Sequence, residues 1–186
     1  MTFLRPPGPV TPGLAIGLLG GSFNPAHEGH LYVAETAIKR LSLDYVWFLV
    51  SPQNPLKPED GMLRFERRFE IAQAMAGRNR RLIVTDIERT IASRYTIDTI
   101  RALTGRFGGV RFVWLMGSDN LEQFHRWQHW QEIAATVDVA VVLRPGSTLA
   151  PLKAKARQRL DSRILIVDGH RSQASATAIR ASQPVG

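Results

Sequence analysis

The chain has 186 residues, no cysteine and a formal net charge of +8 at pH 7. Without cysteine it has no disulfide, no cysteine-based zinc site and no thiolate nucleophile, and its 44 % hydrophobic content argues against disorder of the whole chain. The basic residues are spread along the sequence, which weakens the case for a nucleic-acid partner without removing it.

The start of the chain predicts a leader followed by one domain. Residues 1–13 contain four prolines and no continuous apolar segment, so they do not fit a signal peptide, and we expect a flexible leader there. No later segment is long and apolar enough to cross a bilayer. We therefore expect one domain over residues 14–186, no membrane partner and a cytoplasmic location. The sequence leaves the oligomeric state open.

Strand-like and helix-like segments alternate from residue 14 onwards. Runs of apolar or β-branched residues predict strands, and apolar residues at helical spacing predict helices. In chain order the expected elements are strand 14–19, helix 31–41, strand 45–50, helix 62–76, strand 82–84, helix 96–107, strand 111–116, helix 127–135, strand 137–143, a short basic helix 152–160 and strand 164–167. This alternation indicates an α/β fold with a single doubly wound parallel sheet. Ligands of such sheets bind at the carboxyl ends of the strands, so we expect functional residues just after Leu19, Val50, Met116 and Leu143.

The first expected strand runs into a segment rich in glycine and histidine. Gly20 and Gly21 allow backbone amides to approach a ligand closely, and His27 and His30, at the start of a helix, can face one point. A helix N-terminus favours anions, so two imidazoles beside it would suit a phosphate. The plain alternative is a glycine turn followed by a capped helix. The chain contains neither a GxxxxGK[ST] P-loop nor a GxGxxG fingerprint.

Residues 21–30 match the pattern GxFxPxHxGH at every fixed position. This segment resembles the signature of the nucleotidylyltransferase superfamily that carries HxGH. The resemblance implies a Rossmann-like fold in which His27 and His30 hold the phosphates of ATP and stabilise its α-phosphate during transfer. It also implies that ATP contacts the residues before them, Gly20, Gly21, Ser22 and Phe23.

A second motif lies near the end of the chain, over residues 175–180 (SATAIR). Its hydroxyls could cap a helix, and its arginine could bind phosphate with two hydrogen bonds. Alone, the segment is better explained as an ordinary helix N-cap. Beside the first motif it resembles the superfamily's second signature, ISSTxxR, with Ala174 and Ala176 as departures. That resemblance implies ATP contacts from Ser175, Thr177 and Arg180.

Between the two motifs the sequence resembles the bacterial nicotinate-nucleotide adenylyltransferases. Residues 93–99 resemble the family's SxYTxxT stretch, which implies that Tyr95 and Thr96 bind the acceptor, with Thr96 near its carboxylate. Residues 117–119 resemble the family's GxD, which implies that Asp119 contacts nucleotide ribose. Trp127 matches a tryptophan that stacks on the pyridine ring, and Arg144 matches an arginine that binds phosphate. Singly, each residue is better explained by packing, capping or a solvated strand end; their order and spacing favour the family.

The sequence departs from the family pattern in two places. Residues 54–58 (NPLKP) stand where the family often has Pro-His-Lys, so Leu56 replaces a histidine while Lys57 remains for the triphosphate. The chain ends six residues after Arg180, where relatives usually continue through a helical tail. A shortened final helix would affect stability or assembly.

The resemblance implies transfer of AMP from ATP to nicotinate mononucleotide in NAD biosynthesis, giving nicotinate adenine dinucleotide and pyrophosphate. The acceptor phosphate would attack the α-phosphorus in line, so no protein nucleophile is needed. His27, His30, Lys57 and Arg180 would neutralise charge on the triphosphate. Mg²⁺ carried by ATP would bridge phosphate oxygens, and we assign no metal ligand to the protein.

Three alternatives stay open. A related adenylyltransferase acting on phosphopantetheine usually has Thr at the position of His27. A zinc hydrolase would use His27, His30, His125 and His129, although no well-placed carboxylate accompanies them. A nucleic-acid-binding domain is suggested by charge alone. The preference for nicotinate over nicotinamide mononucleotide rests on Thr96 and a helix N-terminus, and only through the resemblance.

Overall fold

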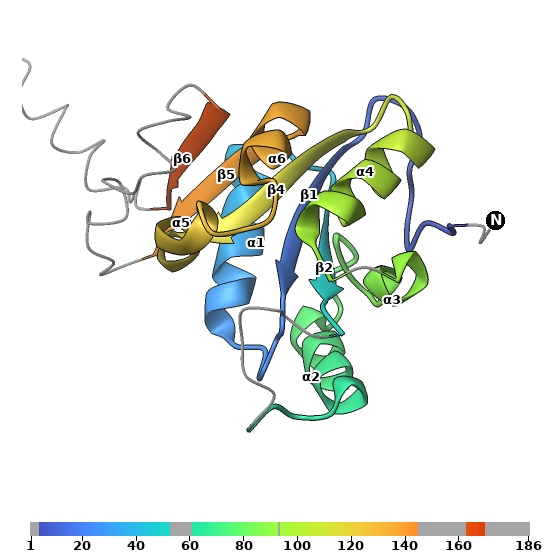
Figure 1. The fold of residues 1–186 in the computed structure, drawn as a ribbon. Helices are drawn as coiled ribbons and strands as arrows, with labels where there is room; N and C mark the ends of the chain where they lie inside the picture. The colour runs from blue at the N-terminus through green and yellow to red at the C-terminus, as the bar shows by residue number, and fades with distance from the viewer. Residues whose placement is uncertain (1–3, 53–60, 93, 145–162, 170–186) are drawn as a thin grey trace, which may run out of the picture.

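The computed structural model describes residues 4–52, 61–92, 94–144 and 163–169. Six parallel strands form one sheet in the order β3-β2-β1-β4-β5-β6 (Figure 1). The strands are β1 (Ala15–Gly21), β2 (Tyr45–Val50), β3 (Leu82–Thr85), β4 (Arg111–Gly117), β5 (Asp138–Leu143) and β6 (Ile164–Asp168). The helices are α1 (Glu28–Arg40), α2 (Phe65–Ala76), α3 (Ile87–Ile91), α4 (Thr96–Arg106), α5 (Ser118–Phe124) and α6 (Trp130–Thr136). The predicted doubly wound parallel sheet is confirmed.

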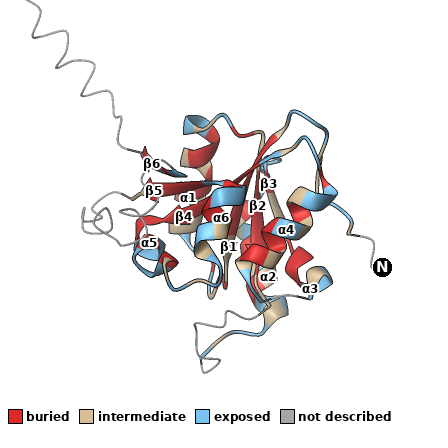
Figure 2. Ribbon diagram, turned by 45° about the horizontal axis from the view of Figure 1, so that its top comes forward, coloured by how far each residue is buried: buried red, intermediate tan, exposed pale blue. Residues whose placement is uncertain are grey.

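The sheet separates two hydrophobic cores, and the buried residues in Figure 2 follow the strands and the inner sides of the helices. Successive strand residues point to opposite faces, so Ile16 and Leu18 of β1 belong to one core and Ala15 and Leu19 to the other. Helices α1 and α2 pack on the second core, and α3 to α6 pack on the first. No helix in the described ranges is both long and apolar enough to cross a membrane.

The chain reverses its direction of winding between β1 and β4. From β1 the sheet extends through β2 to β3 on one side, and β4 starts the other side by pairing with β1. A crevice outside the carboxyl ends of the strands forms at such a switch point, where ligands bind in open α/β sheets. The backbone topology therefore predicts a ligand site at the carboxyl ends of β1 and β4.

Most expected elements are present, with bounds that differ by a few residues. Helix α1 begins at Glu28, three residues before the expected start, because His27 caps it. Helix α2 begins at Phe65 instead of residue 62, and α6 (Trp130–Thr136) begins three residues later and ends one residue later than the expected helix 127–135. Helices α3 and α5, of five and seven residues, were not predicted, since they are too short to show a helical period. The expected helix 152–160 lies outside the described residues.

The segment before β1 contacts the domain. Residues 4–14 contain no helix or strand, but Leu4, Val10 and Leu14 pack, partly buried, against the core beneath α3 to α6. The backbone N–H of Gly13 donates to the carbonyl oxygen of Gly109 at 2.8 Å. The division into a flexible leader over residues 1–13 and a domain from residue 14 stays a prediction.

One buried arginine joins the segments that follow β1 and β2. Arg68, on α2, is only 1 % exposed. Its guanidinium donates to four backbone carbonyl oxygens, those of Ser22 (2.5 Å), Ser51 (2.8 Å), Pro52 (2.9 Å) and Leu63 (3.0 Å). Burial disfavours the charged form and lowers the pKa of Arg68, although nearby Glu66 opposes the shift. We call this set of bonds the Arg68 clamp.

We expect Arg68→Ala to lower the free energy of unfolding by about 3 kcal/mol or more, because it leaves four carbonyl oxygens without their donor. Urea unfolding followed by circular dichroism measures this change. The neighbouring Arg67→Ala is the matched control, since the Arg67 side chain is 65 % exposed and pairs with the exposed Glu70, so we expect a change under about 0.5 kcal/mol. Equal effects of the two substitutions would contradict a structural role for the Arg68 clamp.

Candidate active site

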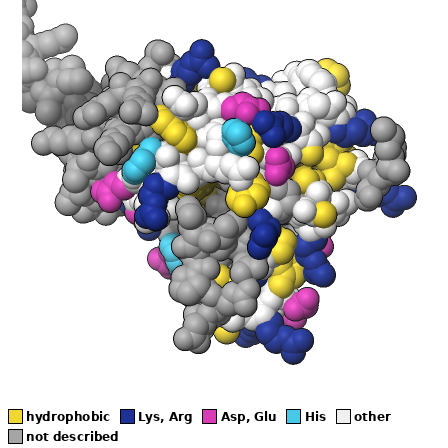
Figure 3. Space-filling model, viewed as in Figure 1, with side chains coloured by type: hydrophobic (Ala, Val, Ile, Leu, Met, Phe, Trp, Pro, Cys, Tyr) yellow, Lys and Arg dark blue, Asp and Glu magenta, His cyan; other side chains and the backbone are white. Residues whose placement is uncertain are grey.

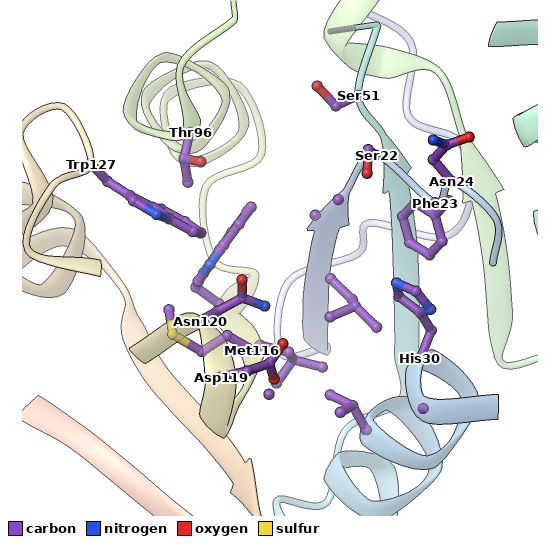
Figure 4. Close-up of a pocket in the computed structure, with 18 of the residues that line it drawn as sticks. Ser22, Phe23, Asn24, His30, Ser51, Thr96, Met116, Asp119, Asn120 and Trp127 are labelled. Carbon is purple, nitrogen blue, oxygen red and sulfur yellow. The ribbon is translucent and has the colours of Figure 1, made fainter. Parts of the chain in front are cut away.

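A pocket of about 380 Å³ opens at the switch point of the sheet. Its wall includes Gly20 and Gly21 from the end of β1, Ser51 after β2, Gly117 at the end of β4 and Arg144 after β5. The four strands named in the sequence analysis therefore all contribute to one cavity. Figure 4 shows Phe23 beside His30 on one side of this pocket and Thr96 beside Trp127 on the other.

His27 and His30 lie together at the start of α1, with ring centroids 4.1 Å apart. His27 is the N-cap: its Nδ1 accepts a hydrogen bond from the Gly29 N–H at 3.1 Å. The Nδ1 of His30 accepts in turn from the backbone N–H of His27 at 3.3 Å. Because Nδ1 is the acceptor in both rings, each neutral imidazole carries its proton on Nε2. Capping thus gives two N–H donors of defined tautomer beside a helix end that attracts anions.

Phe23 supports the second of these histidines. Its ring stacks on His30 with centroids 4.6 Å apart and on Phe48 of β2 at 5.4 Å. Phe23 is 1 % exposed, so the His30 ring rests on a buried apolar platform. Gly20 allows Trp114 to pack on the opposite face of the sheet, since a Cβ at Gly20 would lie 2.5 Å from Cη2 of Trp114. The contacts of Phe23 and Gly20 thus hold the connection between β1 and α1 in place.

Arg144, directly after β5, lies between the N-terminus of α1 and the end of β4. Its guanidinium forms an ion pair with the carboxylate of Asp119, on the first turn of α5. A Cβ at Gly29 would lie 2.9 Å from Nη1 of Arg144, and one at Gly117 would lie 3.5 Å from Nη2. The two glycines therefore leave room for the guanidinium. The sequence analysis assigned Asp119 to a ribose and Arg144 to a phosphate, and it did not predict that the two side chains form an ion pair.

The opposite side of the pocket is formed by α4 and an aromatic cluster. Tyr95 is the N-cap of α4 and Thr96 its first residue, both line the pocket, and the Tyr95 side chain makes no capping hydrogen bond. Trp127 meets Trp114 and Phe124 nearly edge-on, with centroids 6.0 Å and 5.4 Å apart. Backbone amides at the start of α4 and a supported indole ring thus border the same cavity.

The structure brings together every site residue predicted from the sequence that it describes. Those lining the pocket are Gly20, Gly21, Ser22, Phe23, His27, His30, Tyr95, Thr96, Asp119, Trp127 and Arg144. The other four, Lys57, Ser175, Thr177 and Arg180, lie outside the described residues. A role for any of these residues in binding or catalysis stays a prediction.

The described residues do not support the zinc-hydrolase alternative. Within the described ranges, no three side chains among His, Cys, Asp and Glu are grouped so as to hold one metal ion. His125 and His129 are also absent from the part of the pocket wall that the structure describes. His27 and His30 instead line the pocket at the N-terminus of α1.

Positive charge on the face drawn in Figure 3 is dispersed. Lys and Arg side chains stand apart there, with Asp and Glu between them. Some arginines are held by carboxylates, as in the pairs of Arg101 with Glu132 (2.7 Å) and Arg111 with Asp138 (3.2 Å). The described part of this face does not present the continuous basic strip that duplex binding uses.

Sequence reasoning missed Glu88, a buried carboxyl in the pocket wall. Glu88 lies on α3, is 8 % exposed, and accepts a hydrogen bond from Oγ1 of Thr99 at 3.1 Å. Burial raises its pKa from 4.5 to about 7, while the hydrogen bonds from Thr99 and Ser51 partly offset the shift. The helix that carries Glu88 has five residues and no periodic pattern, so the sequence offered no signal for it.

Comparison with known families identifies one match that spans most of the chain. The family model described as Cytidylyltransferase-like matches residues 18–182. A probable nicotinate-nucleotide adenylyltransferase of Parvibaculum lavamentivorans is 50 % identical over 188 aligned residues, covering 92 % of this chain and 93 % of that protein. One of Rhizobium meliloti, with the same description, is 43 % identical and covers 91 % of this chain and 99 % of that protein.

Solved structures share the fold at much lower identity. The nicotinic acid mononucleotide adenylyltransferase of Plasmodium falciparum, complexed with NaAD, aligns with a TM-score of 0.66 at 14 % identity. It covers 87 % of this chain and 78 % of that chain. A putative nicotinate-nucleotide adenylyltransferase from Vibrio parahaemolyticus aligns with a TM-score of 0.57 at 16 % identity, covering 93 % and 85 %. These similarities support the Rossmann-like fold.

The buried carboxyl should make stability depend on pH. A group whose pKa is raised in the folded state contributes stability below its unfolded pKa and loses that contribution as the pH rises through the folded value. For Glu88 the window runs from about 4.5 to about 7, and the whole shift corresponds to about 3 kcal/mol. We expect the difference in free energy of unfolding between the unmodified chain and Glu88→Gln to fall by that order across the window.

Urea titrations at intervals between pH 4.5 and 8 measure this difference. Glu122→Gln, at an exposed position on α5, is the matched control, and its curve should run parallel to that of the unmodified chain. A Glu88→Gln curve that is also parallel would show that the Glu88 carboxyl titrates normally in the folded state.

Proposed function

We propose that this chain, which belongs to the Cytidylyltransferase-like family and within it to the nicotinate-nucleotide adenylyltransferases, transfers AMP from ATP to nicotinate mononucleotide. The products are nicotinate adenine dinucleotide and pyrophosphate, which places the reaction in NAD biosynthesis. The single observation that carries the proposal is the pair of imidazoles capping α1 at the switch point of the sheet. A relative that is 50 % identical over 92 % of this chain bears the name probable nicotinate-nucleotide adenylyltransferase.

The triphosphate of ATP would lie against the N-terminus of α1. There the Nε2–H groups of His27 and His30 can donate to phosphate oxygens, because Nδ1 of each ring is already used by the cap. Gly20 and Gly21 let the end of β1 approach the nucleotide, with Ser22 and Phe23 continuing the same wall. Donors fixed before the reaction stabilise the charge that develops on the α-phosphate, the main electrostatic contribution in such transfers.

The acceptor would lie across the pocket, on the side of α4. Its carboxylate would meet the first amides of α4 and Thr96, because a helix N-terminus favours an anion and Thr96 lines the pocket. Trp127, held edge-on by Trp114 and Phe124, offers an indole ring for stacking on the pyridine, and Tyr95 borders the same space. Asp119 and Arg144 lie between the two sides, where ribose and phosphate would be found.

The reaction needs no protein nucleophile. An oxygen of the acceptor's 5′-phosphate forms a new bond to the α-phosphorus of ATP while the bond from that phosphorus to the β-phosphate oxygen breaks. Pyrophosphate leaves with the electron pair of the broken bond. The enzyme contributes alignment of the two phosphates and neutralisation of their charge. His27 and His30 supply part of that neutralisation, and we assign the rest to Lys57, Ser175, Thr177 and Arg180.

Mg²⁺ enters this proposal with ATP as part of the substrate. It would bridge phosphate oxygens and need few protein ligands. The partners we assign are therefore ATP and nicotinate mononucleotide, with no nucleic acid and no membrane. A cytoplasmic location agrees with a chain that has no cysteine.

We expect the purified chain to release pyrophosphate from Mg-ATP with nicotinate mononucleotide in preference to nicotinamide mononucleotide or phosphopantetheine. The three acceptors test the reaction class and the substrate separately, because they share a phosphate but differ in the group beyond it. Release with phosphopantetheine alone would keep the reaction class and overturn the roles of Thr96 and Trp127. Silence with all three acceptors from folded protein would overturn the proposed function.

We expect His30→Ala to reduce kcat/KM roughly 100-fold or more, since loss of one donor to a developing oxyanion typically costs ~3 kcal/mol. Steady-state pyrophosphate release measures it, and the melting temperature checks folding. His129→Asn is the matched control, because it removes an exposed imidazole outside the pocket and asparagine tolerates the positive φ of 51° at that position. An unchanged kcat/KM in His30→Ala would contradict the role of His30 as a donor to the α-phosphate.

A further inference from the structure

Glu88 is a buried acidic residue in the pocket wall, and the transfer reaction as described above assigns it no role. It joins three elements that border the acceptor side: its own helix α3, the first turn of α4 through Thr99, and the end of β2 through the hydroxyl of Ser51. Thr99 is itself 1 % exposed, so the hydrogen bond between its hydroxyl and Glu88 is sequestered from solvent. An acidic group so placed has consequences for any anion bound nearby.

No salt bridge in the described ranges joins Glu88 to a cation. On the same helix as Glu88, Arg89 forms an ion pair with Glu66 and lies over the ring of Phe65. On α4, Asp98 pairs with Arg101. From α2, the guanidinium of Arg68 is directed to backbone carbonyls, including that of Ser51.

Two further charged groups stand near Glu88 along the chain, the exposed Asp86 and the pocket-lining Arg94. Burial holds the pKa of Glu88 at about 7, so both protonation states are populated near neutral pH.

The proposed seat of the nicotinate carboxylate lies close to this group. Thr96 is the first residue of α4 and Thr99 the fourth, so the hydrogen bond to Glu88 is less than one helical turn, roughly 4.5 Å of rise, from the first amides. Both Glu88 and Thr96 line the pocket. A bound carboxylate and an ionised Glu88 on the wall of the same partly desolvated pocket repel each other, and this repulsion favours the protonated form of Glu88.

We propose that Glu88 sets the preference of the pocket between an acid and an amide acceptor. In its protonated form Glu88 allows the N-terminus of α4 to hold a carboxylate, and in its ionised form it repels one. A carboxamide carries no charge and is indifferent to the change. Binding of the acid therefore draws a fraction of a proton from solvent onto Glu88 when the pH is above neutral. This inference rests on the proposed function, because it requires the acceptor ring to lie beside Thr96.

The test compares nicotinate and nicotinamide mononucleotide between pH 6 and 8.5. The quantity measured is the ratio of their kcat/KM values, in which titration of ATP and of the common 5′-phosphate cancels. We expect the ratio of acid to amide to fall about tenfold across this range in the unmodified chain, the effect of one pKa unit of coupling. It should be independent of pH in Glu88→Gln, which keeps the shape of the side chain, and unchanged from the unmodified profile in Glu122→Gln. Where turnover of the amide is slow, the ratio of its Ki to the Kd of the acid measures the same preference in binding.

A second measurement needs no variant. Calorimetric titration of the unmodified chain at pH 7.5, in two buffers of different ionisation enthalpy, counts the protons taken up on binding each mononucleotide. We expect the acid to take up a larger fraction of a proton than the amide. A ratio independent of pH in the unmodified chain, the same slope in Glu88→Gln, or equal proton uptake for the two ligands would overturn the role of Glu88. Absence of pyrophosphate release with either acceptor at every pH would instead overturn the proposed function.

Discussion

The pocket depends on one buried cation, because the Arg68 clamp holds the segments that leave β1 and β2 at a fixed separation. Parallel strands end at the same edge of the sheet, and the backbone N–H of Ser51, directly after β2, donates to the carbonyl oxygen of Gly21 at the end of β1 (2.9 Å). A guanidinium has five N–H donors and can bind the four carbonyls of the Arg68 clamp at once, whereas a lysine ammonium has only three donors. By binding the carbonyls of Ser22 and Ser51, Arg68 places the start of the α1 connection beside the wall that carries Glu88.

At the start of α1, His27 and His30 both stabilise the helix end and supply the donors of the proposed chemistry. Helix α1 needs an N-cap, and the usual residues there are Ser, Thr, Asp or Asn. An imidazole cap satisfies the same amides and leaves a second nitrogen with its proton on the far side of the ring. His30 completes the arrangement by accepting from the His27 backbone, and Phe23 supports its ring from below. A stable start of the helix and a defined pair of donors are therefore one structural feature.

The sequence was most informative where the chemistry is local. The run from Gly20 to His30 predicted a strand, a turn and a helix, and the structure has all three, because glycine freedom and helix capping act within a few residues. Strand alternation predicted the sheet for the same reason. The missing parts arise from distant contacts. Arg68 stands on the apolar side of its helix, three residues after Phe65 and four before Ala72, which is a sign of burial, but the carbonyls it binds come from other segments. Glu88 has no local sign at all, since its burial is created by Thr99 and the end of β2.

The pocket straddles the edge of a sheet whose two faces carry separate cores. His27, His30 and Phe23 rest on the core beneath α1 and α2, whereas Trp127 and the first turn of α4 rest on the core beneath α3 to α6. The sheet separates the two cores, so a substitution that changes the packing of one core leaves the packing of the other core unchanged. The half of the site to which we assign the triphosphate can therefore stay constant while substitutions in the other core change the proposed acceptor half. A fold divided in this way allows a lineage to exchange its acceptor without rebuilding its means of activating ATP.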